Sequence, residues 1–514
     1  MILLFLSCQG PATPGDSALQ ADTAPVADSG EPGETGVDSG DSGELVDTTT
    51  DVIVVGSGPA GVAAALSAEA GGANVILFER EDSAGSGLRL GGLAFAVNTP
   101  WQAAVGVEDS VDAAAAEWGE ITGVSGDSAG PQRFFAESSA TLEWLAARGA
   151  EIGEPLITAG GGSVARIHPL LWAPGKDPFE SVMAGFSGDV RLGVEVTEPL
   201  LADGAVVGVR WREVASGLEG STGARSVVLA TGGFLRDLDT VATLRPDLAV
   251  REPLFETNPS STGGGLPFLS AARAGADRPE EIGAYLHSVQ DPQQVEGEPL
   301  IFSSNGPFIL VGADGRRFTK DDALTDLGPM LDAPEGEVWV VAAGIGATAG
   351  TFSAPGYNAA EGQGIVKLTA AEVVALGSDE VFEADTLEEL ATLTGLGSGL
   401  VDEVEEFGAR VAAGAADPFG RMLDPTDALV DPPWLALQVH PGLAKNFGGA
   451  ATDVEGHVLD DEGAVIPGLY AAGEVAGMIV GGGSGTGFMG SVGACYQGGL
   501  AAGATAAAEA AIPE

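Results

Sequence analysis

The clearest pattern of apolar and polar positions spans residues 51–80, DVIVVGSGPAGVAAALSAEAGGANVILFER. Its first apolar run, Val52 to Val55, predicts a short buried strand, the alanine-rich stretch predicts a helix, and Val75 to Phe78 predict a second strand. Between the first strand and the helix, Gly56, Gly58 and Gly61 stand in G-x-G-x-x-G spacing, and Glu79 closes the second strand. This order predicts the βαβ unit that binds a dinucleotide.

Each part of this unit has a physical task. Gly56 permits the tight turn, Gly58 lets the backbone approach a pyrophosphate, and Gly61 lets helix and strand pack closely. The helix N-terminus presents free N–H groups and a positive dipole to the phosphates, while the acid after the second strand accepts hydrogen bonds from a ribose. We therefore assign the dinucleotide contacts to Gly56, Gly58, Pro59, Ala60, Gly61, Glu79 and Arg80. The alternative is a glycine-lined turn that binds nothing. The correct order and spacing of strand, glycines, helix, second strand and acid argue against this alternative.

Other segments follow recognisable periods. Residues 107–152 are helical in pattern, with Phe135, Leu142, Leu145 and Ala146 on one stripe and Gly149 ending the helix. Residues 194–209 predict two strands around the turn Asp203-Gly204, and residues 309–318 predict a hairpin around Asp314-Gly315. Residues 385–396 predict a helix with Asp385 as its N-cap. Residues 226–234 and 469–472 predict buried strands, and a last helix is expected to begin near Ser491.

Composition narrows the class of partner. The chain has 514 residues, enough for two domains, and a formal net charge of −52. This charge opposes binding to nucleic acid or to anionic lipid. The four histidines and two cysteines show no spacing typical of metal ligands, so we expect no metal site.

The N-terminal residues differ from the rest. Residues 1–8 are apolar and end at Cys8, like the end of a bacterial lipoprotein signal, but they are too short to span a membrane and carry no basic residue. Either Met1 is not the true start or the likeness is accidental. Residues 9–48 are acidic and rich in Gly, Ser and Pro, so we expect a disordered linker. Our interpretation is an extracytoplasmic protein anchored by lipid at Cys8; the alternative is a cytoplasmic enzyme with a disordered tail.

A second glycine-rich loop follows the first unit. Gly85, Ser86, Gly91, Gly92, Thr99, Pro100 and Gln102 stand where the flavoprotein family of fumarate reductase, succinate dehydrogenase and 3-ketosteroid dehydrogenase has a GGSTxxSGG loop and a TPxQ-like stretch. The chain resembles this family from about Asp51 to Ala506, with departures at Ala84, Gly87 and Leu90. The resemblance implies FAD, and because no histidine occupies the place of covalent attachment, we expect noncovalent FAD.

The resemblance also implies the fold. We expect an α/β protein with a Rossmann-like, glutathione-reductase-type FAD-binding domain and an inserted α+β capping domain. The expected limits are 49–250 for the first part of the FAD domain, 251–433 for the capping domain and its connections, and 434–514 for the second part. Further cofactor contacts implied by matching motifs are Val196, the ATGG residues Ala230, Thr231 and Gly232, the GE pair Gly473-Glu474, and Ser491 and Val492 at the last helix.

The family's substrate-binding arginines are missing. The position of the proton-delivering arginine holds Thr325, and a later arginine is replaced near Gly483 and Ser484. Because dicarboxylates are usually clamped by arginines, we expect a neutral or larger substrate. The remaining candidates for catalytic residues are His440, Lys445, His287 and Arg166, with His440 suited to carry a proton near neutral pH.

These inferences predict an FAD-dependent oxidoreductase that moves a hydride between flavin N5 and a substrate C–C bond. The alternatives are an oxidase or dehydrogenase acting on an amine or alcohol, and a flavoprotein without catalysis that binds or carries electrons. The sequence holds no haem or iron–sulfur motif, so we expect the electron partner to be a quinone or another redox protein.

Overall fold

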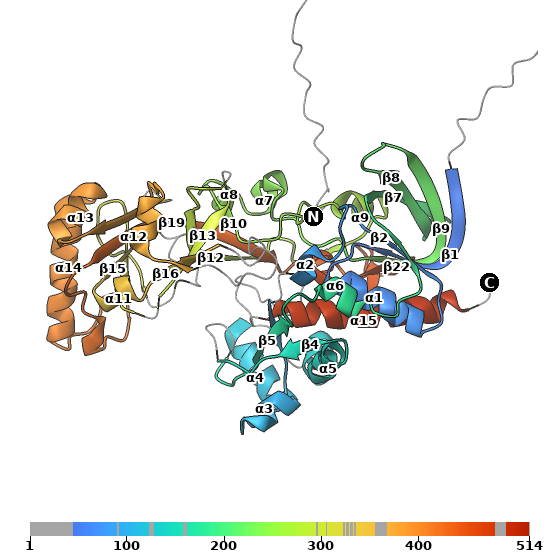
Figure 1. Cartoon of the computed structure of the whole chain (residues 1–514), viewed down its shortest axis with the longest axis horizontal. Coiled ribbons are helices and arrows are strands. Elements are labelled where there is room, and N and C mark those ends of the chain that lie inside the picture. The colour runs from blue at the N-terminus through green and yellow to red at the C-terminus, as the bar shows by residue number, and fades with distance from the viewer. Residues whose placement is uncertain are drawn as a thin grey trace, which may run out of the picture.

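The computed structural model describes residues 45–89, 92–122, 128–157, 162–294, 297–304, 306–321, 324, 328, 333, 336–354, 367–477 and 490–512. In Figure 1 the described chain forms two bodies: one holds strands β1, β2, β9 and β22 with helices α1 and α15, and the other holds strands β12 to β19 with helices α11 to α14. This arrangement confirms the predicted α/β fold with a capping domain. The predicted lipid anchor at Cys8 and the acidic linker up to residue 44 lie outside the described residues. No helix in the described part of the chain is long and apolar enough to cross a membrane.

The first body is built on a sheet whose central strands are parallel. The described residues give the order β22-β9-β1-β2-β6, with β21 antiparallel at one edge and β7 and β8 forming an antiparallel meander onto β9. The bounds are β1 Leu45–Val55, β2 Val75–Phe78, β6 Asp189–Arg191, β7 Val194–Ala202, β8 Ala205–Glu213, β9 Glu219–Leu229, β21 His457–Leu459 and β22 Val465–Ala471. The strands and the turn predicted at 52–55, 75–78 and 194–209 are therefore confirmed.

Strand β1 is buried on both faces, as expected for a doubly wound sheet. Val52 and Val54 pack with the helices α1 (Pro59–Ala70) and α15 (Ser491–Ala510), whereas Ile53 and Val55 pack beneath the meander and α9 (Leu266–Ala271). Glycines allow α15 to lie directly on α1, since a Cβ at Gly503 would stand 2.2 Å from the carbonyl oxygen of Ala64. This packing brings the last helix of the chain beside the first.

A smaller layer lies against α15. It consists of the sheet β3-β5-β4 and the helices α3, α4 and α5. The bounds are β3 Gly92–Phe95, β4 Ala150–Ile152, β5 Ile167–Trp172, α2 Ser86–Arg89, α3 Pro100–Ala104, α4 Val111–Thr122, α5 Ala129–Ala146 and α6 Pro178–Val182. The predicted helical region 107–152 is thus two described helices, and three members of its apolar stripe, Phe135, Leu142 and Leu145, are buried as expected.

The capping body holds a nine-stranded sheet among the described residues, in the order β14-β15-β19-β12-β13-β16-β17 with β10 and β18 also paired to β19. One face packs on α13 and α14, and the other forms a core with residues of α12. The bounds are β10 Leu254–Phe255, β12 Ile282–Gln290, β13 Pro299–Ser303, β14 Phe308–Val311, β15 Val338–Ala343, β16 Thr351–Ser353, β17 Lys367–Leu368, β18 Val381–Ala384, β19 Trp434–Asn446, α11 Ile345–Thr348, α12 Ala370–Ala375, α13 Leu387–Leu393 and α14 Gly397–Ala412.

Three details differ from the predictions. Strand β19 belongs to the capping sheet, where it pairs with β15 and β12, so the capping body extends to Asn446 rather than to residue 433. Strand β14 pairs along its length with β15; the turn at Asp314-Gly315 is present, closed by the bridge Val311–Arg317 and the Gly312–Arg316 backbone hydrogen bond, but no second strand follows it among the described residues. The N-cap of α13 is Thr386 instead of Asp385, because the Thr386 hydroxyl accepts the backbone N–H of Glu389.

Short elements complete the described connections. They are α7 Leu238–Leu244, α8 Pro246–Ala249, β11 Ala276–Asp277, the 3₁₀ turns Pro425–Asp427 and Gly473–Val475, and β20 Gly449–Ala450.

Candidate functional site

A cavity of about 400 Å³ is lined by residues from both bodies. This volume lies within the range typical of sites for small molecules and cofactors. Predicted cofactor residues that line it are Gly56, Gly58, Pro59, Ala60, Glu79, Arg80, Ser86, Val196, Ala230, Thr231, Gly232, Gly473, Glu474, Ser491 and Val492. The structure therefore brings together segments that are more than 400 residues apart in the chain.

The glycine loop has the geometry that its spacing predicts. Gly56 has a φ of +99°, which favours glycine, and a Cβ at Gly61 would lie 1.8 Å from the carbonyl oxygen of Gly56. Gly58 is the N-cap of α1, and a Cβ there would meet no protein atom within 4 Å. Gly61 thus serves the packing of helix on turn, while Gly58 leaves open space at the helix N-terminus on the cavity side.

The Glu79 carboxylate is held in place at the end of β2. Its Oε2 accepts the backbone N–H of Ser57 at 2.9 Å and the Ser57 hydroxyl at 2.5 Å. The same hydroxyl accepts the backbone N–H of Gly85 at 2.9 Å, which joins the second glycine-rich loop to the first. Arg80 donates to the Thr262 hydroxyl at 2.9 Å. These contacts orient an acid and a base at the position where the fingerprint places the ribose.

Three predicted cofactor residues in the described part of the chain do not line the cavity. Gly61 lies inside the packing described above, and Gly85 has a φ of +78° with no room for a side chain beside Phe179. Gly92 packs against Val492: a Cβ at Gly92 would lie only 3.0 Å from the Cγ2 atom of Val492. Gly91 lies outside the described residues. The described three therefore support the loops around the cavity rather than face it.

Glu474 is the most perturbed acid of the cavity. Its Oε1 accepts the backbone N–H of Asn446 at 3.0 Å, and the Asn446 amide donates to the backbone carbonyl oxygen of Glu474 at 2.8 Å. Burial raises the pKa of Glu474 to about 7, although the hydrogen bonds from Asn446 and Gly233 and the charge of Lys445 lower it. The protein freed of FAD therefore holds a carboxyl group that is half-protonated near neutral pH.

The raised pKa predicts how Glu474→Gln changes stability with pH. Because the folded-state pKa lies above the unfolded value, the stability contributed by the neutral carboxyl is present below about pH 4.5 and is lost as the pH rises through 7. Each unit of difference between the folded and unfolded pKa is worth about 1.4 kcal/mol of stability. Because the carboxyl also faces the cavity, where solvent screens it, we expect the total pH-dependent loss of stability to be roughly 2 kcal/mol. Chemical denaturation of FAD-free protein should give equal stabilities at pH 5 and a more stable Gln variant at pH 8.

A control for this prediction is Glu455→Gln, at a side chain that is 51% exposed. Its effect on stability should stay nearly constant between pH 5 and pH 8. A Glu474→Gln variant that is less stable than wild type at pH 8 would contradict the assignment of a desolvated charge to Glu474.

The capping body contributes a different set of side chains to the cavity. Tyr285 of β12 and Lys445 of β19 line it together with Glu256, Thr257 and Asn258 from the segment after β10. Lys445 is therefore the one predicted catalytic candidate that lines the cavity. Tyr285 was missed by sequence reasoning, because a single tyrosine in a strand forms no motif.

The other three candidates lie away from the lining. His440 is bonded to Glu380 at 3.0 Å; burial lowers its pKa, but this hydrogen bond and charge outweigh burial and raise it. Arg166 is fully buried and binds Asp109 and Glu117, which makes it part of a packed ion cluster. His287 stands behind Tyr285, with 5.4 Å between the ring centroids. His440 and Arg166 are therefore held by ion-pair partners away from the cavity, and His287 packs beside Tyr285, which lines the cavity.

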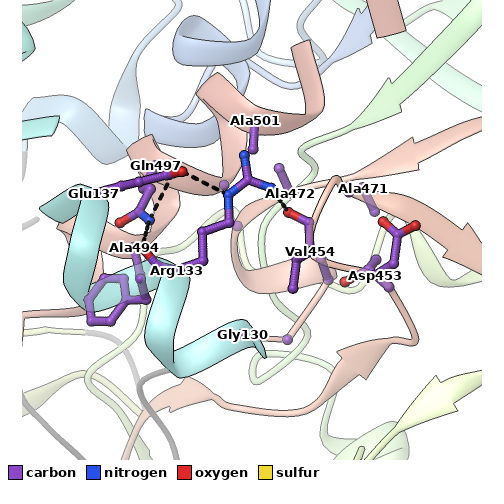
Figure 2. Close-up of a pocket in the computed structure, with 17 residues that line it drawn as sticks. Gly130, Arg133, Glu137, Asp453, Val454, Ala471, Ala472, Ala494, Gln497 and Ala501 are labelled. Carbon is purple, nitrogen blue, oxygen red and sulfur yellow. Dashed lines mark hydrogen bonds and ion pairs between the residues drawn. The ribbon is translucent and has the colours of Figure 1, made fainter. Parts of the chain in front are cut away.

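A second, smaller hollow of about 140 Å³ lies beside α5 and α15 and shares Ala472 and Gly473 with the larger one. Figure 2 shows Arg133 extending across it toward the backbone of Val454, with Glu137 on the other side. Its volume holds a few water molecules and is too small for a dinucleotide. In the part of the chain that is described, no group of three or more His, Cys, Asp or Glu side chains is placed to hold a metal ion.

The larger cavity fits FAD by the chemistry of its lining. A Cβ at Gly58 would fill space that the protein leaves empty, and α1 directs its N-terminus at that space. The buried hydroxyl oxygen of Thr231 also lines the cavity and has no hydrogen-bond partner among the described residues. Gly58 to Ala60 would hold the pyrophosphate, Glu79 the ribose, Glu474 the ribityl chain, and the N-terminus of α15 the isoalloxazine.

Comparison with known proteins agrees with this fit. A family model described as "FAD binding domain" matches residues 51–487. The "Probable fumarate reductase Ifc3" of Shewanella frigidimarina is 30% identical over 464 residues, covering 84% of this chain and 71% of that protein. The "Digoxin reductase" of Eggerthella lenta is 26% identical over 539 residues, covering 92% and 88%. The open conformation of a flavocytochrome c3 fumarate reductase aligns with a TM-score of 0.70 at 27% identity, covering 91% of this chain and 80% of that one.

Proposed function

The chain belongs to the FAD binding domain family, and from this premise we propose that it transfers a hydride between flavin N5 and one carbon of a substrate C–C bond whose neighbouring carbon gains or loses a proton. It is an FAD-dependent oxidoreductase that acts on C–C bonds, with relatives named as reductases of fumarate and of digoxin. FAD, when bound, supplies the redox chemistry. The residues of this chain bind and orient the substrate, exclude water and handle the proton.

The charge of the cavity lining supports a substrate other than a small dicarboxylate. Among the described residues of the lining, Arg80 and Lys445 are the only bases, and Arg80 is engaged by Thr262 and Glu81 beside the ribose position. Within the described residues, the lining from the capping body therefore holds one cation, Lys445, and one carboxylate, Glu256. Two substrate carboxylates would lack a second positive partner, so a neutral or singly charged alkene fits better.

We propose that electrons reach the enzyme from a quinone or a separate redox protein. The sequence carries no motif for haem or iron–sulfur attachment. Because this chain has a net charge of −52, it would attract a protein partner whose docking face is positively charged.

The proposed reaction is tested by stopped-flow reoxidation of the reduced enzyme. We expect 2-cyclohexen-1-one, a neutral enone, to reoxidise the enzyme at least about 100-fold faster than fumarate, because two uncompensated charges cost several kcal/mol in a partly buried site. Fastest reoxidation by fumarate would contradict the exclusion of dicarboxylates. Fastest reoxidation by O2 would indicate an oxidase, and reoxidation by no compound tested would indicate a binding or electron-carrier module.

A further inference from the structure

Reduction of an alkene requires a proton donor as well as a hydride. The family's proton-delivering arginine is missing here: its position holds Thr325, which lies outside the described residues. Three charged residues of the described lining, Glu79, Arg80 and Glu195, are bonded to other protein groups around the end of β2. The other titratable side chains of the described lining are the acids Glu256 and Glu474, the base Lys445, Cys495 and Tyr285. Cys495 is a poor donor, since burial and the nearby charge of Glu474 raise its pKa to about 12. Within the described lining, four candidate donors therefore remain.

Tyr285 differs from the other described tyrosines in its position. Tyr470 and Tyr496 are 0% and 1% exposed in the core of the FAD-binding body, whereas Tyr285 lies half-buried on β12 and lines the cavity. Strand β12 pairs with β19 so that Tyr285 stands opposite Gly442. The phenol ring thus lies in the part of the lining that comes from the capping body, which is also the part that contains Lys445.

A histidine packs beside this tyrosine, and a glutamate of the lining lies beside the histidine. The His287 ring centroid lies 5.4 Å from the Tyr285 ring centroid, and His287 Nε2 lies 3.1 Å from Glu256 Oε1. The Ser288 hydroxyl donates to the same Glu256 oxygen at 2.6 Å. Gly442 makes room for this carboxylate, since a Cβ there would lie 1.8 Å from Oε1. Glu256 is therefore fixed as an acceptor beside the imidazole.

The acid Glu474 and the base Lys445 have different surroundings. Glu474 stands on the 3₁₀ turn of the FAD-binding body, and its Oε1 is bonded to the backbone of Asn446. Lys445 has its ammonium 5.5 Å from the ring centroid of Phe447, and its charge acts on Glu474. Tyr285 differs from both in packing against the His287 ring, which in turn lies beside the Glu256 carboxylate.

We propose that Tyr285 is the proton donor of the reaction and that His287 and Glu256 position it. The inference rests on the proposed function. The π bond of the alkene breaks as one carbon gains the hydride that FAD supplies and its neighbour gains the proton of the Tyr285 hydroxyl. The substrate is thereby reduced by two electrons and the cofactor is oxidised by two. The O–H electron pair stays on the phenolate oxygen, which takes a proton back from solvent through the cavity.

The test compares Tyr285→Phe with wild type in single-turnover reoxidation by 2-cyclohexen-1-one. Loss of a general acid slows the proton-dependent step by about 100-fold or more. Tyr285→Phe keeps the ring and its packing, so FAD content and the flavin reduction potential should match wild type. The affinity for cyclohexanone, the saturated product, measured by calorimetry, should change less than about threefold. The substitution should weaken stabilisation of the transition state and leave ground-state binding nearly unchanged. Wild type should also react more slowly in D2O.

Tyr496→Phe is the matched control, because it removes the same hydroxyl from a core tyrosine outside the cavity, and it should react like wild type. A Tyr285→Phe rate within twofold of wild type would overturn the Tyr285 assignment and leave the proposed function intact. A large loss in Glu474→Gln with no loss in Tyr285→Phe would overturn it in favour of Glu474. If neither this enone nor any other alkene reoxidised wild type, the proposed function would fail and the donor assignment with it.

Discussion

Alanine at Gly61 should abolish FAD binding and destabilise the protein. The new Cβ would lie 1.8 Å from the carbonyl oxygen of Gly56, and a backbone atom cannot move aside without shifting α1 from the turn. Forced overpacking of this kind costs about 1–3 kcal/mol or more. The FAD content of purified Gly61→Ala, measured by absorbance, should fall below about a tenth of the wild-type content, and its unfolding midpoint in urea should fall.

Two neighbouring substitutions separate packing from cofactor contact. Gly58→Ala places its Cβ in open space at the cavity, so the FAD-free protein should keep its stability while FAD affinity falls by about 100-fold. Gly408→Ala in α14 also meets no atom within 4 Å but lies in the capping body, and it should leave FAD affinity unchanged. Wild-type FAD affinity in Gly58→Ala would contradict the placement of the pyrophosphate at the N-terminus of α1.

Removal of the Arg317 charge should unfold the capping body more readily. Arg317, Asp321 and Asp417 have side chains that are 0% exposed, and the guanidinium donates to Asp321 at 2.7 Å and to Asp417 at 2.6 Å. Arg317→Met leaves two buried carboxylates without their main partner, which typically costs about 3–5 kcal/mol. Urea denaturation monitored by tryptophan fluorescence should show this loss.

The adjacent arginine provides the control. Arg316 is 35% exposed, and its two closer partners are the exposed acids Asp402 and Glu406, with Glu403 at 3.8 Å. Arg316→Met should therefore lower the free energy of unfolding by less than about 1 kcal/mol. Equal costs for the two variants would show that the Arg317 cluster contributes no more than a surface ion pair. Arg317 is therefore an anchor of the capping fold.

The cofactor-binding half was predictable because its signals are local. Strand, glycines, helix and acid lie within 30 residues, and two of the glycines meet a constraint within the same unit: the positive φ of Gly56 and the close approach of Gly61 to the Gly56 carbonyl oxygen. Glu474 and Ser491 were placed through motifs of the resemblance rather than through periodicity. Their meeting with Gly58 in one cavity depends on the packing of α15 on α1, which the sequence alone does not specify.

The capping half was less predictable because its contacts are distant in sequence. Strand β19 pairs with residues about 100 and 160 positions earlier, so its 13 residues carried no local sign of the sheet to which they belong. The same separation in sequence explains why the structural partners of the catalytic candidates were not predicted. The partner of His440 is Glu380 and that of Arg166 is Asp109, each about 60 residues away, and such pairs turn a possible catalytic group into a structural one.

The most direct test of the account is the cofactor content of gently purified protein. The account predicts yellow protein with one FAD for each chain, released into the supernatant by acid precipitation because no covalent bond holds it. It also predicts that FAD-free protein regains the flavin spectrum when FAD is added. Colourless protein that takes up no FAD, or flavin that stays with the precipitated chain, would contradict it.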